Sequence, residues 1–270
     1  DLVAKKYKVG DQPVAILTFD DLTGKTPFIK DIRRLLKTLE KHYEYPVDVE
    51  YTVNFTSSGK MQVNLVQCRP LQAKGEGRHV EFPKEADEER LIFSSSGNFM
   101  GGNVSQPIGR IIYIDPKAYG GLLFQKKFEI ARLIGRLNRG ISRAKLPVML
   151  IGPGRWGTRD ATLGVPVSFA EISSFAALAE VSDPAAGFNP DLSFGSHFFL
   201  DLVEANIFYI ALFAGKKEVF FNREWLERQR NILTELRPEE AGSAPVVRIY
   251  DCDLRLFSDI TTQKVILTKM

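Results

Sequence analysis

Four side chains that suit phosphate and metal chemistry lie within residues 48–69. They are Asp48, Glu50, Gln67 and Arg69, called the polar quartet below. Carboxylates hold Mg²⁺ that bridges the terminal phosphates of a nucleotide, and an arginine balances the charge that moves with a phosphoryl group. These residue types suit a nucleotide-phosphate site if the chain brings the four side chains together.

The segment between them predicts a β-hairpin that does so. If Ser58-Gly59 is a two-residue turn, Ser57 lies opposite Lys60. The same register pairs the first acid of the quartet with the arginine and the second acid with the amide. Because side chains alternate along a strand, all four then share one face. The other face, free to pack on a core, carries Val49, Tyr51, Val66 and Cys68.

The hairpin also has an interpretation without function. An exposed cross-strand ion pair between Asp48 and Arg69 contributes only about 0.2–1 kcal/mol to stability and needs no ligand to explain it. The pattern alone leaves both interpretations open.

The stretch from Phe28 to Leu71 resembles the end of the ATP-grasp nucleotide-binding domain of the phosphoenolpyruvate synthase and pyruvate phosphate dikinase family. The strings "DVEY" and "LVQCRPL" are similar to the Asp-x-Glu and Gln-x-Arg-Pro strands that end this domain in the family. The resemblance implies bound ATP and Mg²⁺. It implies that Asp48, Glu50 and Gln67 contact metal and phosphates, with Glu50 and Gln67 as metal ligands. It also implies that Arg69 binds phosphate and takes part in catalysis.

The family's earlier, phosphate-gripping half of this domain is not found in the sequence. A missing N-terminal half of the ATP-grasp domain is therefore the expected partner, and this piece alone is expected to be inactive. The chain also starts at Asp1 rather than Met and shows no leader, which favours a piece of a longer protein.

The later part of the chain resembles the swivelling domain of the same family, in which a histidine takes phosphate from ATP and delivers it to a second site. The similar strings are, in order, "GGNVSQPIGRIIYID", "LPVMLIG", "AALAEV" and "FGSHFFLDLVEANIFYI". The resemblance implies that His197 is the catalytic phosphocarrier. The sequence departs from the family at Gly195, where Thr is usual, and at Phe198-Phe199, where two alanines are usual.

Chemistry suits a histidine at that place, because imidazole is a good nucleophile and leaving group near neutral pH. A helix N-terminus would also offer free backbone N–H groups to its phosphate. The alternative for His197 is a capping or packing role. His42, at the end of a predicted helix, and His79, in a charged connection, have no partner at metal-ligand spacing.

The string "GPGRWGTRD", residues 152–160, follows a predicted buried strand. Its glycines allow the backbone to approach an anion, and Arg155 and Arg159 could bind the phosphate on His197 or an acidic substrate. The string is neither a Walker sequence nor GxGxxG. The alternative is a tight turn whose Trp156 packs into the core and whose arginines are solvated.

The elements that position these residues predict an α+β (mixed α/β) fold. An amphipathic helix is expected over 27–43. Strands are expected over 110–114, 147–151, 207–212, 246–250 and 264–268, and helices over 122–137, 198–205 and 223–236, the last capped by Asn222. We expect the ATP-grasp piece at residues 1–72, a charged linker at 73–92 and the swivelling domain at 93–270.

The charge and composition of the whole chain argue against several other classes of protein. The 270 residues carry 36 basic and 33 acidic side chains, a net charge of only +3, so we expect no nucleic-acid partner and no membrane attraction. Apolar runs are far shorter than the roughly 20 residues of a membrane span. The two cysteines, Cys68 and Cys252, form no metal-type spacing and favour a reducing compartment, the cytoplasm.

These features favour an ATP-dependent phosphotransferase, a kinase or dikinase in its full length, that transfers phosphate through an enzyme histidine to a small acceptor. The resemblance implies pyruvate as that acceptor. The alternative is a non-catalytic module of the same descent that binds a nucleotide, an anion or a protein.

Overall fold

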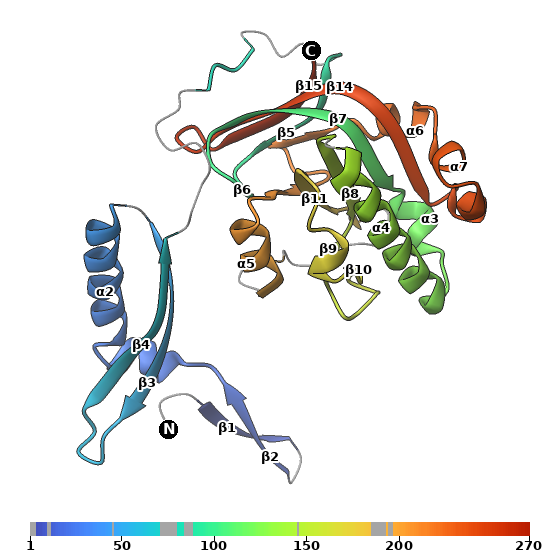
Figure 1. The fold of residues 1–270 in the computed structure, drawn as a ribbon. Helices are drawn as coiled ribbons and strands as arrows, with labels where there is room; N and C mark the ends of the chain where they lie inside the picture. Colours follow the sequence, from blue (N-terminus) through green and yellow to red (C-terminus); the bar gives the residue numbers. More distant parts are fainter. Residues whose placement is uncertain are drawn as a thin grey trace. The chain divides into compact units, whose positions relative to one another are not determined.

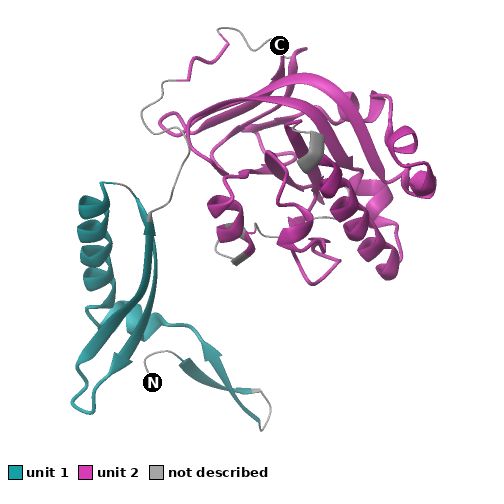
Figure 2. Cartoon of the chain, in the orientation of Figure 1, with its two compact units in different colours: residues 1–72 teal, residues 73–270 magenta. Residues whose placement is uncertain are grey.

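The computed structural model describes residues 4–9, 12–44, 46–70, 80–83, 89–144, 146–184, 193 and 197–270. The chain divides into two compact units, residues 1–72 and residues 73–270, which Figure 2 colours separately. Each unit is described by itself below.

Unit 1 contains two antiparallel strand pairs and two helices (Figure 1). In chain order these are β1 (Ala4–Val9), β2 (Gln12–Leu17), α1 (Asp20–Lys25), α2 (Phe28–Tyr43), β3 (Val47–Phe55) and β4 (Met61–Pro70). The helix expected over 27–43 is confirmed as α2. Its half-buried apolar stripe packs on the β3–β4 hairpin, where the rings of Phe28 and Tyr51 lie 6.2 Å apart.

Unit 2 is built on a strongly curled, nine-stranded mixed sheet with the order β13-β5-β15-β14-β7-β8-β11-β12-β6 (Figure 1). Four neighbouring strands are parallel: β7 (Val104–Ile114), β8 (Val148–Pro153), β11 (Ala177–Ser182) and β12 (Phe208–Phe213). Antiparallel strands extend both edges: β5 (Leu91–Ser96), β6 (Phe99–Met100), β13 (Val219–Phe221), β14 (Val247–Asp259) and β15 (Lys264–Lys269). The short pair β9 (Arg155–Trp156) and β10 (Gly164–Val165) lies outside the sheet.

Both faces of the sheet are buried, as the continuous apolar runs of its parallel strands require. One face packs on a layer made by the helices α3 (Pro116–Gly120), α4 (Phe124–Ala144), α5 (His197–Glu204) and α7 (Leu233–Leu236), with the 3₁₀ turn η1 (Phe169–Glu171). The other face is closed by the sheet's own antiparallel strands together with α6 (Arg223–Arg228). A second 3₁₀ segment, η3, covers Pro238–Ser243.

The mixed α/β fold class is confirmed, whereas the ATP-grasp and swivelling assignments of the units stay predictions. Leu91 and Ile92, at the end of the expected linker, already belong to β5. The cap at Asn222 is confirmed, because its Oδ1 accepts from the Trp225 N–H at 2.9 Å. Within the described residues, no helix combines the length and apolar composition of a membrane span.

The helix expected over 223–236 is wrong in its middle, where the chain breaks into α6 and α7. The cause is Asn231, whose Oδ1 accepts from the Ile249 N–H and whose Nδ2 donates to the Val247 carbonyl, both at 3.0 Å. The Ile232 N–H also donates to the Ile249 carbonyl. These bonds to β14 replace helical bonds, so periodicity alone could not predict the break.

Candidate functional site

The polar quartet lies at the open end of the β3–β4 hairpin. The strands pair Asp48 with Arg69 and Glu50 with Gln67, as the sequence predicts. Directly opposed residues in an antiparallel pair point to the same face, so the four side chains lie together. Both acids are exposed, whereas Gln67 and Arg69 are half-buried.

The two-residue turn predicted at Ser58-Gly59 is wrong, but a bulge further along β4 restores the predicted pairing of the quartet. The loop has three residues between Thr56 and Lys60, with the Gly59 N–H donating to the Thr56 carbonyl at 2.8 Å and Gly59 at φ +78°. From Phe55 to Tyr51 the pairing is therefore one residue off the expected register. A bulge at Val66 adds one residue to β4 and restores the expected pairing for the quartet.

The bulge also corrects the expected apolar face. Val66 was expected among its members, but it is the unpaired residue and is 64% exposed. The position that pairs with Tyr51 is Leu65. The sequence holds a signal for this bulge, because the apolar residues of β4 recur at odd positions up to Leu65 and then change phase to Cys68.

The polar face is longer than the quartet. Beyond it, Thr52 pairs with Asn64 and Asn54 pairs with Gln62. The Asn64 amide donates to Thr52 Oγ1 at 3.4 Å. These residues were missed because the uniform register placed Leu65 opposite Thr52. The apolar face packs on α2, so the polar face lies on the opposite side of the hairpin from that helix.

The quartet fits an oxygen-bound Mg²⁺ that shares its ligands with phosphates. Glu50 offers a carboxylate and Gln67 an amide oxygen from directly paired positions. Mg²⁺ is usually held by one or two protein groups, with water and substrate phosphates completing its six ligands. Among the described residues, no group of three or more His, Cys, Asp or Glu side chains forms an all-protein metal site.

The loop of residues 152–160 lies in unit 2 at the carboxyl end of β8, an edge where open α/β sheets bind ligands. Its Trp156 is only 1% exposed, and the indole Nε1–H donates to the Ala179 carbonyl at 3.0 Å. Arg155 is half-buried and Arg159 is exposed. Trp156 is thus packed into the core, as expected if the loop is a tight turn that binds no ligand.

The loop's glycines are required by packing. A Cβ at Gly152 would lie 2.5 Å from the ring of Trp156. Gly154 has φ +65°, and a Cβ there would lie 2.2 Å from the Leu163 carbonyl oxygen. Neither close approach involves an anion, so these two glycines need no ligand to explain them.

A buried carboxylate that the sequence did not single out anchors this loop. Glu180 Oε1 accepts from the Trp156 N–H at 2.9 Å and from Ser193 Oγ–H at 2.5 Å. Its Oε2 accepts from Tyr209 O–H at 2.6 Å and from the Ser193 N–H at 3.3 Å. Burial raises the pKa of Glu180 above the ordinary value, against the opposing effect of these hydrogen bonds. A lone acid in the otherwise apolar string "AALAEV" was the available signal.

His197 is the first residue of α5, but its side chain lies outside the described residues. The neighbouring Phe198 packs against the loop, since a Cβ at Gly157 would lie 2.3 Å from its ring. The backbone start of α5 therefore lies next to the loop that carries Arg155 and Arg159. Of the other histidines, His42 is exposed at the end of α2, and His79 lies outside the described residues.

Comparison with known proteins identifies one family. The sequence model of a protein family described as "Pyruvate phosphate dikinase, AMP/ATP-binding domain" matches residues 4–90. This range contains the whole polar quartet. No curated protein and no solved structure matches the chain.

Proposed function

We propose that the polar quartet binds the phosphates of ATP, because residues 4–90 match the pyruvate phosphate dikinase AMP/ATP-binding domain, which confirms the resemblance predicted for residues 28–71. One observation carries the proposal: the hairpin gathers two acids, an amide and an arginine on one exposed face within the matched range. Packing of unit 1 does not require this face, because the core contact with α2 is made by the other one.

Each member of the quartet has a role in this proposal. Glu50 and Gln67 would hold Mg²⁺, which when bound would neutralise phosphate charge and polarise the phosphoryl group. Asp48, which lies opposite Arg69, would orient that arginine and help to bind the nucleotide with its metal. Arg69 binds the phosphate that is transferred, where its fixed cationic fork opposes the charge that develops on the oxygens.

The transfer itself is proposed to use His197. A ring nitrogen forms a bond to phosphorus while the bond from that phosphorus to the bridging oxygen of the nucleotide breaks, and the oxygen leaves with the electron pair. Support comes from the place of His197 at the start of α5, beside the loop of residues 152–160. Arg155 and Arg159 would then stabilise the phosphohistidine before transfer to a pyruvate-like acceptor.

The proposal includes a partner, the N-terminal half of the ATP-grasp domain. Large apolar side chains on β2 and just after it support a covered surface there, because Leu17 is 66% exposed and Ile16 and Phe19 are also exposed. The proposal places the protein in the cytoplasm, where the free thiols of Cys68 and Cys252 would stay reduced.

The rival is a non-catalytic module that binds a nucleotide, an anion or a protein through the same hairpin. One observation favours it: Gly152 and Gly154 of the loop in unit 2 are explained by packing, which leaves no structural requirement for a phosphate there. The rival shares the first step of the proposal, ATP binding, and lacks the second.

The binding step is tested by following backbone amide signals of the 270-residue chain in NMR while ATP and Mg²⁺ are added at millimolar concentration. Shifts centred on residues 48–50 and 67–69, lost in Glu50→Ala and in Arg69→Ala, support the site. The matched control is Asn54→Ala, on the same face of β3 nearer the turn. Shifts that leave the hairpin untouched contradict it.

The transfer step is tested by labelling. The chain joined to its proposed N-terminal half is incubated with ATP labelled on its phosphates, and acid-labile label is measured on the protein. Label that disappears in His197→Ala and persists in His42→Ala supports the phosphocarrier. Label that persists in His197→Ala, or no label from a protein that binds ATP, supports the rival.

A further inference from the structure

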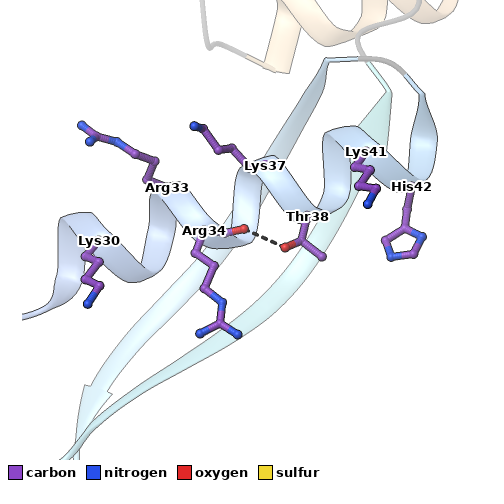
Figure 3. A pocket seen from close by; sticks show the side chains of 7 residues that line it. All are labelled: Lys30, Arg33, Arg34, Lys37, Thr38, Lys41 and His42. Atoms are coloured by element: carbon purple, nitrogen blue, oxygen red, sulfur yellow. Dashed lines mark hydrogen bonds between the residues drawn. The ribbon is translucent and has the colours of Figure 1, made fainter.

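The outer side of α2 presents a second charged surface in unit 1. Its residues, called the basic face below, are Lys30, Arg33, Arg34, Lys37, Thr38, Lys41 and His42. They line an open groove of about 580 Å³ along the helix, shown in Figure 3. All seven are exposed.

The sequence of α2 builds the groove from two helical rows. Residues 30, 34, 38 and 42 form one row with a spacing of four, and residues 33, 37 and 41 form the next. Thr38 has a short side chain whose hydroxyl donates to the Arg34 carbonyl at 2.8 Å, so it forms the low point between longer cationic side chains (Figure 3). From Lys30 to Lys41 the array is roughly 16 Å long.

Among the residues that the structure describes, nothing neutralises the charges of the basic face. None of its residues forms an ion pair with any residue that the structure describes. The helix carries only two acids, Asp31 and Glu40, so its cations outnumber its acids. Five cations in two adjacent rows form a strongly positive strip, although the net charge of the whole chain is only +3.

We propose that the basic face binds the phosphate backbone of a nucleic acid without reading its sequence. A row of cations with a shallow groove matches the regular row of phosphates along such a backbone, and binding gains free energy by releasing counterions. This proposal replaces the expectation, drawn from net charge, that the chain has no nucleic-acid partner. Net charge averages over residues that the fold places on different surfaces.

The composition of the surface favours a nucleic acid over a protein partner. Interfaces between proteins are poor in lysine and have an apolar centre, whereas those with nucleic acids are polar and strongly positive. The groove is lined by cations, a histidine and a threonine. Its members offer no large apolar side chain that a protein partner could bury.

The same helix is a poor fit to a membrane surface. An amphipathic helix binds a bilayer by inserting its apolar side. In α2 that side is half-buried against the hairpin, where Phe28 packs on Tyr51. The proposal is also independent of the ATP site, because the quartet lies on the hairpin face that points away from α2.

The test measures fluorescence anisotropy of a short labelled DNA duplex and of a single-stranded RNA as the 270-residue protein is added at several salt concentrations. We expect binding that weakens steeply with salt. The double variant Arg33→Glu/Lys37→Glu should lose about tenfold or more in affinity, and the slope of log K against log salt should fall by about two. The matched control is Lys60→Glu, an exposed cation at the hairpin turn, which should bind as the unaltered protein does.

Glutamate is a good helix former, and both replaced side chains are exposed, so the double variant should keep its helical circular dichroism. The proposal is overturned if the unaltered protein does not bind either probe at low salt, or if Lys60→Glu loses as much affinity as the double variant. It is also overturned if polyglutamate or vesicles rich in phosphatidylserine bind the basic face and the nucleic acids do not.

Discussion

The two units place their most conspicuous residues in opposite environments. Among the described residues of unit 1, Leu22 alone is buried, the basic face is exposed, and the quartet is exposed at its two acids and half-buried at Gln67 and Arg69. Unit 2 has a large apolar cluster on each face of its sheet and a small third one around Phe257, and its conspicuous loop is packed into one of the large clusters through Trp156. The quartet and the basic face have no packing role that would explain them, so they are the stronger functional candidates.

The same difference applies to the glycines. In unit 2, Gly154 and Gly164 are needed because a Cβ would lie 2.2 Å from the Leu163 carbonyl oxygen at the first and 2.0 Å from the Arg155 carbonyl oxygen at the second. In unit 1, a Cβ on Gly59 would meet nothing within 4 Å, and only its positive φ favours glycine. A glycine-rich loop in a packed unit thus says less about ligands than its composition suggests.

The largest expected effect is that of Trp156→Ala. Removing a fully buried indole should lower the unfolding free energy of unit 2 by about 3–5 kcal/mol. Urea unfolding, followed by fluorescence of the remaining Trp225, measures this loss. Arg159→Ala, an exposed residue of the same loop, should change stability by less than about 0.5 kcal/mol. Equal losses in the two variants would show that the loop is not anchored by its tryptophan.

Glu180→Ala should have the next largest effect. It leaves the Trp156 N–H, the Ser193 N–H and the Tyr209 hydroxyl buried without their acceptor, at about 1–3 kcal/mol for each group that finds no other partner. The same unfolding experiment measures it. Glu129→Ala, an exposed acid on α4, is the control. A change no larger than the control's would contradict the anchoring role of this carboxylate.

The pH dependence of unit 2 tests the same residue. The folded-state pKa of Glu180 is raised by burial, so the folded form holds this proton more tightly than the unfolded chain does. Its contribution to stability is fully present below the unfolded pKa, near 4.5, and is lost as pH rises through the folded value. Glu180→Gln removes the titration, so its stability should fall less over that window. If the unfolding free energy of the unaltered protein and that of Glu180→Gln change with pH in parallel, the raised pKa of Glu180 is contradicted.

The main elements of the fold could be predicted from periodicity. The stripe in α2 and the apolar runs in β8 and β12 are local patterns, and each was placed within two residues of its observed limits. The break at Asn231 could not be predicted in this way, because its hydrogen bonds go to β14, about 18 residues later in the chain. The long pairing of β14 with β7 is likewise set by the sheet as a whole.

The pairing of the quartet was predicted for a reason that was partly wrong. The turn was taken one residue too short, and the bulge at Val66 makes up the difference. The alternation of polar and apolar residues along β4 would have revealed both the longer turn and the bulge. The role of His197 stays a prediction. The residue begins α5, but its side chain lies outside the described residues.

Gly59→Ala tests the observed turn. The left-handed conformation of Gly59, φ +78°, is unfavourable for any residue with a Cβ, so the variant should lower the stability of unit 1 by about 1 kcal/mol. Thermal unfolding of unit 1, followed by NMR signals of β3, measures the loss. In the two-residue turn Ser58 would be the first central residue, so Ser58→Ala is the matched control and should be nearly neutral. A neutral Gly59→Ala would contradict the three-residue loop.

The smallest expected stability effect is that of the quartet itself. Arg69→Met keeps most of the side-chain volume and removes the charge, and a cross-strand pair at the surface contributes only about 0.2–1 kcal/mol. Unit 1 should therefore unfold almost as before, while the amide shifts caused by ATP with Mg²⁺ disappear. This combination separates the two interpretations of the hairpin, because a purely structural ion pair would show a change in unfolding without a change in nucleotide binding. Loss of both at once would show that Arg69 holds the hairpin together, and binding would then have to be measured again in Arg69→Lys, which keeps the charge.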